Sequence, residues 1–229
     1  MRISGVPGIE RASRQHTLNI RAVAKHAAKE LGKQFHECCF AVAHLGSGIS
    51  IVSIVEGRIA DATDAQMGEG PFSVNRAGAL PLRGLMKLCY SKPEPEVKTI
   101  LTKESGFQGY IGTSDFREVE RRIGDGDRGA KLIYDAMVYQ IAKNIGAYWA
   151  VLRGAGDAIL LTGGMMKSAR LTRDLLEYVS PLGRTLVYPG EEEMSALARG
   201  AIDALTGAEP IRVYPMGEAE QSATPRRGQ

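Results

Sequence analysis

Residues 38–63 have the sequence CCFAVAHLGSGISIVSIVEGRIADAT. Within this stretch the apolar run Cys38–Leu45 precedes the β-branched segment Ile49–Val55, and Arg58–Thr63 follows. Short runs of this kind, separated by Gly-Ser-Gly and by Glu-Gly, are typical of strands joined by tight turns. The stretch therefore predicts a three-stranded antiparallel meander.

The segments around the meander predict helices and two further strands. Apolar residues at helical spacing predict helices over Thr17–Leu31, Pro81–Tyr90, Pro95–Lys103, Asp115–Ile123, Arg128–Leu152, Ser168–Val179 and Glu192–Leu205. Buried strands are predicted over Asp157–Leu161 and Thr185–Tyr188. Residues 64–80 lack periodicity and contain several glycines, so we expect a long irregular loop, which inside a compact domain is usually functional. Together these elements predict an α/β fold.

Composition and net charge exclude several classes of protein. With 229 residues, 44% hydrophobic and 24% charged, the chain is neither a disordered protein nor a small disulfide scaffold. Its net charge of +3 is too small for a polyanion groove, so we expect no nucleic-acid partner. Three cysteines, two of them adjacent, indicate reduced thiols in a cytoplasmic protein. We expect no membrane association, because no apolar stretch approaches the roughly 18 residues of a membrane span.

Two glycine segments are candidates for binding an anion. Gly46, Ser47 and Gly48 follow His44 at the tip of the predicted hairpin, where backbone N–H groups, a hydroxyl and an imidazole can face one ligand. An ordinary hairpin turn with a hydrogen-bonded histidine is the alternative. Thr162-Gly163-Gly164 joins a predicted strand to a predicted helix, so it fits either a phosphate or nucleotide contact or a plain connection.

Charged residues in loops and at helix starts are further candidates. Arg76 is framed by glycines and can clamp a phosphate or a carboxylate, although most loop arginines are simply solvated. Asp115 and Arg117 fit a helix start with surface charges at least as well as they fit a binding site. The acidic run Glu191–Glu193 fits either a helix start that complements the dipole or a carboxylate that faces Mg²⁺.

Two patterns that suggest other ligands are rejected. The G-x-G-x-x-G spacing of Gly124–Gly129 joins two predicted helices and follows no strand, so it is not a dinucleotide motif. His36, Cys38 and Cys39 have no second pair of ligands at metal-binding spacing, which favours core thiols over a zinc site.

Taken in this order, the pieces resemble the acetate kinase family, and within it the butyrate kinase branch, of the superfamily of sugar kinases, heat-shock chaperones and actin. The matching segments are Arg2–Arg11, Val42–Gly48, Gly68–Phe72, Asn75–Gly78, Ser114–Glu118, Asp157–Gly164 and Tyr188–Glu193. The resemblance extends over nearly all of residues 2–206, so no single short motif carries it. The resemblance implies an α/β, ribonuclease H-like (actin-like ATPase) lobe in which the meander, further strands and flanking helices combine.

The resemblance also implies a reaction. It is the transfer of a phosphoryl group from ATP to butyrate, or to a related short- or branched-chain fatty acid, giving ADP and an acyl phosphate with Mg²⁺ present. A carboxylate that attacks the γ-phosphoryl group in line needs positioning and cationic or N–H donors, and it needs no covalent nucleophile on the protein.

Individual residues acquire roles through the same resemblance. His16 matches the family histidine placed on the transferring phosphoryl group, and Arg76 matches the arginine that holds the acyl substrate and phosphoryl oxygens. His44, with Gly46, Ser47 and Gly48, matches the loop at the β- and γ-phosphates. The implied contacts to the nucleotide and the metal are Asp115, Arg117, Gly163 and Gly164 for the nucleotide and Glu192 for Mg²⁺.

The resemblance implies a first lobe ahead of the matching segments, and we expect this sequence to start after it. We therefore expect residues 1–190 to be the C-terminal nucleotide-binding lobe, 191–206 to be a terminal helix that packs on the first lobe, and 207–229 to be a disordered tail. A start codon assigned too late, a broken gene or a separate chain would each account for the difference. The alternative function is a catalytically inactive nucleotide-binding or oligomerisation remnant. Family members also lead us to expect a homo-oligomer.

Overall fold

The computed structural model describes residues 3–190 and 193–207. The chain forms two compact units that divide at residue 193. The first unit holds a sheet with most of the helices, and the second holds helix α8 (Glu193–Leu205). The predicted helix over Glu192–Leu205 is thus confirmed in its described part. Glu192 itself and the expected disordered tail from residue 208 onward lie outside the described residues.

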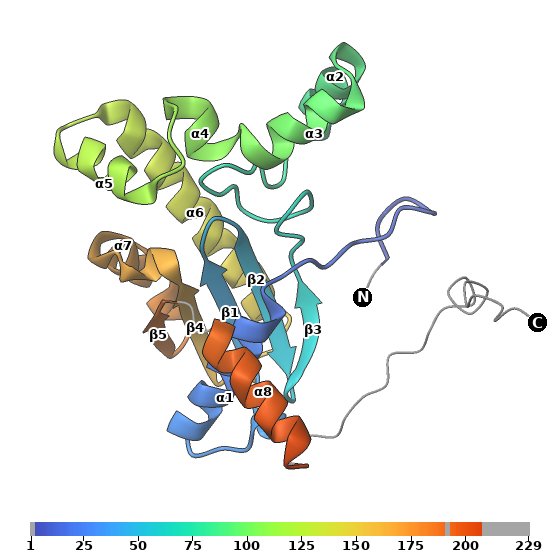
Figure 1. Cartoon of the computed structure of the whole chain (residues 1–229), viewed down its shortest axis with the longest axis vertical. Helices are drawn as coiled ribbons and strands as arrows, with labels where there is room; N and C mark the ends of the chain where they lie inside the picture. Colours follow the sequence, from blue (N-terminus) through green and yellow to red (C-terminus); the bar gives the residue numbers. More distant parts are fainter. Residues whose placement is uncertain (1–2, 191–192, 208–229) are drawn as a thin grey trace, which may run out of the picture. The chain divides into compact units, whose positions relative to one another are not determined.

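Among the described residues, the first unit contains one five-stranded sheet. Its strands are β1 (Phe40–Leu45), β2 (Ile49–Val55), β3 (Arg58–Ala62), β4 (Ala158–Gly163) and β5 (Thr185–Pro189). They lie in the order β3-β2-β1-β4-β5 (Figure 1). β2 is antiparallel to both β1 and β3, whereas β4 is parallel to both β1 and β5. The predicted meander is therefore confirmed, and β4 and β5 extend it into a mixed sheet.

Helices surround this sheet. The α-helices of the first unit are α1 (Thr17–Glu30), α2 (Leu82–Ser91), α3 (Glu94–Lys103), α4 (Gly106–Ile111), α5 (Phe116–Gly124), α6 (Arg128–Ala150) and α7 (Ala169–Val179). The shorter 3-10 helices are η1 (Phe35–Glu37), η2 (Gly164–Lys167) and η3 (Ser180–Leu182). Each α-helix that the sequence predicts in this unit is confirmed, with ends that differ by at most two residues.

Two details of the prediction are wrong. Helix α4 is not among the predicted helices, because tertiary packing rather than local propensity fixes its start. Its first residue, Gly106, has a φ of +57°, and a Cβ there would lie 1.8 Å from the carbonyl oxygen of Ser73. Strand β4 also continues to Gly163, which the sequence places in a loop. It does so because Gly163 and Gly190 exchange two backbone hydrogen bonds, of 3.1 and 3.0 Å.

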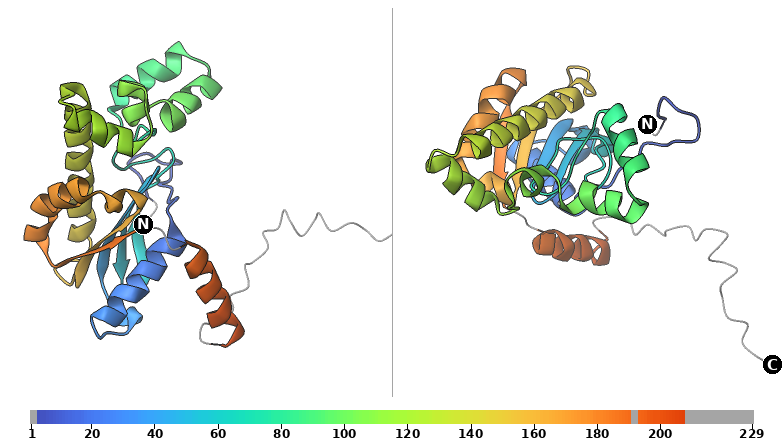
Figure 2. Two further views of the ribbon diagram at one scale, coloured as in Figure 1. Left: turned by 60° about the vertical axis from the view of Figure 1, so that its left-hand side comes forward. Right: turned by 90° about the horizontal axis from the view of Figure 1, so that it is seen from above.

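Helices cover both faces of the sheet. On one face Phe40 and Val42 of β1 belong to the apolar cluster that includes α1, and on the other Ala41 and Ala43 belong to the cluster that includes α6 and α7 (Figure 2). Burial on both sides explains why these strand residues are apolar without alternation. Because successive residues of a strand point to opposite faces, His44 shares the α1 face with Val42.

The carboxyl ends of four strands lie at the same end of the sheet. β4 and β5 run parallel to β1, and β3 also runs parallel to β1 because both are antiparallel to β2. Helices α2 to α5 lie toward the end of the unit at which β1 finishes (Figure 1). Ligands of open α/β sheets bind outside the carboxyl ends of the strands. The turn after β1 and the loop after β3 therefore lie where a ligand is expected.

Candidate functional site

Two histidine rings stack at the carboxyl end of β1. His16 directly precedes α1, and His44 is the next-to-last residue of β1. The two ring centroids are 3.9 Å apart, and the ring planes are inclined by 18°. His44 is buried and His16 is half-buried. The fold thus brings together two predicted site residues that are far apart in the sequence.

Each ring contacts a buried polar side chain. The Nδ1 atom of His16 lies 2.9 Å from Oγ of Ser50, and Ser50 faces His44 across the β1–β2 pairing. The Nδ1 atom of His44 lies 2.7 Å from Nδ2 of Asn19, a buried residue in the first turn of α1. Our sequence reasoning missed Ser50 and Asn19. The available signals were a polar residue inside an apolar strand and an amide in the first turn of the helix that follows His16.

His44 is a neutral ring at physiological pH. Burial, and secondly the adjacent ring of His16, lowers the pKa of His44 from 6.5 to about 3. A neutral imidazole has one N–H donor and one acceptor nitrogen. His44 can therefore orient a ligand through a directed hydrogen bond rather than through a full positive charge.

Acidification is expected to destabilise the fold through His44. Between pH 6.5 and about 3 the unfolded chain binds a proton at this ring and the folded chain does not, so stability is fully present above pH 6.5 and falls as the pH falls. The free energy of unfolding should drop by roughly 1.4 kcal/mol for each pH unit in this range. Urea unfolding at neutral pH and roughly one unit below pH 6.5 measures the drop. It should be smaller in His44→Gln than in wild type or in His36→Gln, which changes an exposed ring. Equal drops in the three proteins would contradict the assignment.

The predicted arginine reaches the turn that follows β1. Nη1 of Arg76 donates to the carbonyl oxygen of Ala65 at 2.7 Å. The guanidinium lies against Gly48, since a Cβ on that residue would be only 2.2 Å from the same Nη1. The hydroxyl of Ser73 donates to the carbonyl oxygen of Ser47 at 2.7 Å, which fixes the loop after β3 on the turn. A guanidinium and a glycine turn with an exposed serine therefore lie together at the edge of the sheet.

The two predicted glycine segments are also in contact. Gly163, at a φ of +102°, packs so closely on β1 that a Cβ there would lie 2.3 Å from the carbonyl oxygen of Leu45. Gly164, the first residue of η2, is exposed. Within the other segment, the N–H of Gly46 donates to the carbonyl oxygen of Gly48 at 3.2 Å. The N–H group of Gly46 is therefore used within the turn. Among the three turn residues, Ser47 and Gly48 remain as predicted anion contacts.

Asp115 and Arg117 cap helix α5 and pair with each other. The carboxylate of Asp115 accepts hydrogen bonds from the backbone N–H of Arg117 at 2.9 Å and from its guanidinium at 2.8 Å. Both side chains are exposed. Helix α5 is tied to the segment after β4, because the hydroxyl of Ser168 donates to the carboxylate of Glu120. A capped helix start accounts for these contacts of the pair, so its nucleotide role stays a prediction.

An arginine that we did not single out from the sequence joins three segments. Arg11 forms an ion pair of 3.0 Å with Asp61 of β3 and another with Glu69 in the loop that follows. Arg11 belongs to the segment that precedes His16, and Glu69 belongs to the loop that contains Arg76. Arg11 therefore connects the segments that carry His16 and Arg76 to strand β3.

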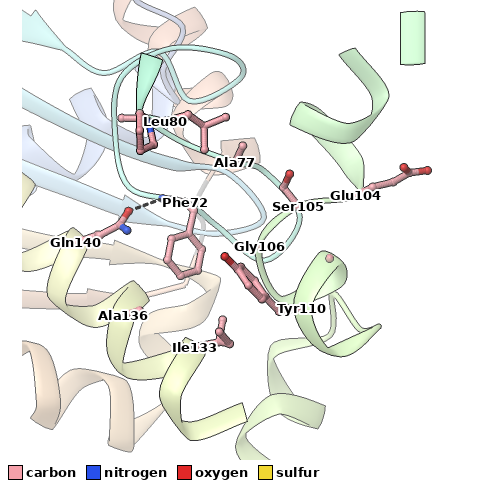
Figure 3. Close-up of a pocket in the computed structure, with 13 residues that line it drawn as sticks. Phe72, Ala77, Leu80, Glu104, Ser105, Gly106, Tyr110, Ile133, Ala136 and Gln140 are labelled. Carbon is pink, nitrogen blue, oxygen red and sulfur yellow. Dashed lines mark hydrogen bonds between the residues drawn. The ribbon is translucent and has the colours of Figure 1, made fainter. Parts of the chain in front are cut away.

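A cavity of about 480 Å³ lies elsewhere along the Arg76 loop (Figure 3). Phe72, Tyr110 and Ile133 line much of it, and the side chain of Gln140 accepts a hydrogen bond from the backbone N–H of Phe72 at 3.4 Å. None of the site residues predicted from the sequence lines it. The cavity is thus distinct from the histidine pair and the glycine turn.

The described residues offer no assembled metal site. Within residues 3–190 and 193–207, no three His, Cys, Asp or Glu side chains converge as metal ligands. Cys38 and Cys39 are buried, one in each of the two apolar clusters. The glycines at 124–129 join α5 to α6, whose first turn is capped by Asp127, as the rejection of a dinucleotide motif requires. Nor does the described chain contain a helix that is both long and apolar enough to span a membrane.

This chain is similar to known carboxylic acid kinases. The model of the acetokinase family matches residues 8–188. A probable butyrate kinase of Clostridium botulinum (strain Eklund 17B / Type B) is 42% identical over 215 residues, which are 93% of this chain and 61% of that protein. A probable butyrate kinase of Thermotoga petrophila is 44% identical over 215 residues, which are 93% of this chain and 60% of that protein. This chain therefore spans about 60% of the length of these relatives.

A solved structure confirms the fold class. The crystal structure of Porphyromonas gingivalis acetate kinase matches 89% of this chain and 60% of its own, with a TM-score of 0.79 and 23% sequence identity. At that identity the likeness concerns the fold. The expected α/β, ribonuclease H-like lobe of the actin-like ATPase type is thereby confirmed.

Proposed function

The chain belongs to the acetokinase family, and from this premise we propose that it acts as a kinase of short-chain carboxylic acids. The reaction is ATP plus butyrate, or a related short- or branched-chain acid, to ADP plus the acyl phosphate. The carboxylate oxygen forms a bond to the γ-phosphorus, and the bond from that phosphorus to the bridging oxygen of ADP breaks. The observation that carries the proposal is the stacked pair His16 and His44 beside a glycine turn on which Arg76 lies.

This arrangement suits charge that is spread over phosphoryl oxygens. Arg76 supplies a fixed positive charge and a planar set of N–H donors, which match phosphate and carboxylate oxygens. Among the described residues it forms no ion pair that would neutralise that charge. His16 and His44 supply directed donors, and the turn at Ser47 and Gly48 supplies a hydroxyl and an N–H group. Such donors stabilise a phosphoryl transition state without a covalent intermediate on the protein.

We assign the nucleotide to the neighbouring segment after β4. Gly163 lies against Leu45 at the end of β1, and η2, which begins at Gly164, also contacts β1, so a nucleotide whose phosphates contact the neighbouring turn can extend along this segment. Helix α5 is linked to the same segment through Glu120 and Ser168, which supports a nucleotide contact for Asp115 and Arg117 near its start.

Mg²⁺ belongs to the proposal only as a companion of ATP. The described residues contain no cluster of metal ligands, and Glu192 lies outside them. We therefore assign no step of the reaction to a protein-bound metal. We also propose that residues 1–190 form the nucleotide-binding lobe, that the terminal helix packs on a first lobe, and that the protein is a cytoplasmic homo-oligomer.

Trapping of the product tests the proposal. The purified chain, incubated with butyrate, ATP and Mg²⁺, is expected to form butyryl phosphate, which hydroxylamine captures as the hydroxamate. Calorimetric titration with ATP is run on the same preparation. Hydroxamate that depends on both ATP and butyrate supports the kinase. ATP binding without hydroxamate would favour the inactive nucleotide-binding remnant, and absence of both would overturn the two functions for this chain.

A further inference from the structure

Asn19 is a buried polar residue that the proposed reaction does not otherwise use. It lies in the first turn of α1, fully buried, on the helix face that packs against the sheet. Its amide nitrogen is 2.7 Å from Nδ1 of His44. Burial of an amide side chain costs free energy unless the amide is hydrogen-bonded. The contact with His44 therefore gives this polar group a specific purpose in the fold.

The chemistry of the contact determines which ring nitrogen of His44 carries the proton. An amide nitrogen donates hydrogen bonds and does not accept them, so Nδ1 of His44 must offer its lone pair to Asn19. A neutral imidazole has a single N–H group, and with Nδ1 as the acceptor that group is at Nε2. The contact thus favours one of the two neutral forms of the ring.

The neighbouring ring is held by a different kind of partner. Nδ1 of His16 faces the hydroxyl of Ser50, which can either donate or accept a hydrogen bond. The contact with Ser50 therefore leaves the tautomer of His16 open, in contrast to the contact of Asn19 with His44. This difference makes Ser50 a natural control for Asn19, because both side chains are fully buried and each contacts Nδ1 of one ring of the stacked pair.

We propose that Asn19 is a positioning residue that holds His44 as the Nε2–H tautomer, so that the ring presents an N–H donor at Nε2. The use of that donor toward phosphoryl oxygens rests on the proposed function, whereas the tautomer itself does not. A donor stabilises negative charge that develops on those oxygens, and an acceptor nitrogen in its place would repel it. Asn19 would therefore act on the reaction entirely through His44.

Nitrogen NMR of the ligand-free chain tests the tautomer directly. Long-range ¹H–¹⁵N correlation of ¹⁵N-histidine-labelled protein distinguishes a protonated ring nitrogen from an unprotonated one. The signals of His44 are those lost in His44→Gln. The expected result at neutral pH is a protonated Nε2 and an unprotonated Nδ1. A protonated Nδ1 with an unprotonated Nε2 in the wild-type chain would overturn the proposal, and this measurement depends on no variant of Asn19.

Two substitutions then test whether Asn19 is the cause. Asn19→Asp replaces the donor with an acceptor, so the His44 signals should move to the Nδ1–H form or to the doubly protonated ring. Ser50→Ala, the control, should alter the signals of His16 and leave the His44 tautomer unchanged. Amide spectra establish that each variant is folded. An unchanged His44 tautomer in folded Asn19→Asp would show that Asn19 does not fix it.

The test also separates this inference from the proposed function. If the chain forms no hydroxamate but His44 is the Nε2–H tautomer, and Asn19→Asp reverses that tautomer, the role of Asn19 is supported and the kinase function is contradicted. If the chain is active but His44 is the Nδ1–H tautomer, only the role of Asn19 is contradicted.

Discussion

Gly163→Ala is expected to lower the free energy of unfolding by about 3 kcal/mol or more, because two costs add at this position. The added Cβ would lie 2.3 Å from the carbonyl oxygen and 2.6 Å from the nitrogen of Leu45, distances that real Cβ atoms essentially never show. The obstacle is backbone in the centre of the sheet, so no flexible side chain can move aside. In addition, the φ of +102° is strained for any residue with a Cβ.

Urea unfolding followed by circular dichroism measures this loss. Gly146→Ala is the matched control, since it adds the same methyl group inside helix α6, where the nearest atom is Cδ1 of Leu182 at 3.8 Å. There the change should be neutral or stabilising, by up to about 1 kcal/mol, because alanine favours a helix. Similar unfolding midpoints for the two variants would mean that the close contact between β4 and β1 is not needed for stability.

Much of the fold could be predicted because its signals are local. The meander follows from short apolar and β-branched runs separated by glycine turns, and α6 follows from an apolar stripe that includes Met137, Ile141 and Ile145, all buried. Helix α4 gave no such signal. Its start depends on a close approach between Gly106 and Ser73, residues 33 positions apart, and no periodicity in the sequence encodes a contact of that kind.

The candidate site could be predicted as a set of residue types but not as a set of contacts. His16, His44 and Arg76 came from three separate segments, and only the sheet topology brings those segments to one edge. In the sequence, Asn19 is an ordinary polar residue of a helix. Its contact with His44 arises because alternate side chains of β1 point to the face of the sheet on which α1 packs, and the sequence of α1 alone does not encode that packing.

Arg76→Ala is expected to reduce the rate of acyl phosphate formation by roughly 10²–10³-fold, as loss of one preorganised donor to a transition state does. The reason lies in the position of the side chain. Arg76 is held against Gly48 and by the carbonyl oxygen of Ala65, so its charge is fixed beside the turn before any ligand binds. The rate of Arg76→Lys should lie between those of wild type and Arg76→Ala, because lysine keeps the positive charge but lacks the planar pair of N–H donors.

The hydroxamate assay and titration with ATP together locate the effect. If Arg76 acts mainly on the transition state, the rate should fall much further than the affinity for ATP. Arg58→Ala is the control, because Arg58 is an exposed arginine at the amino end of β3, whereas the site lies at the carboxyl ends of the parallel strands. It should match wild type in both measurements. If Arg76→Ala is as active as Arg58→Ala, Arg76 has no role in the site. If the rate and the affinity for ATP fall equally, Arg76 acts only in binding.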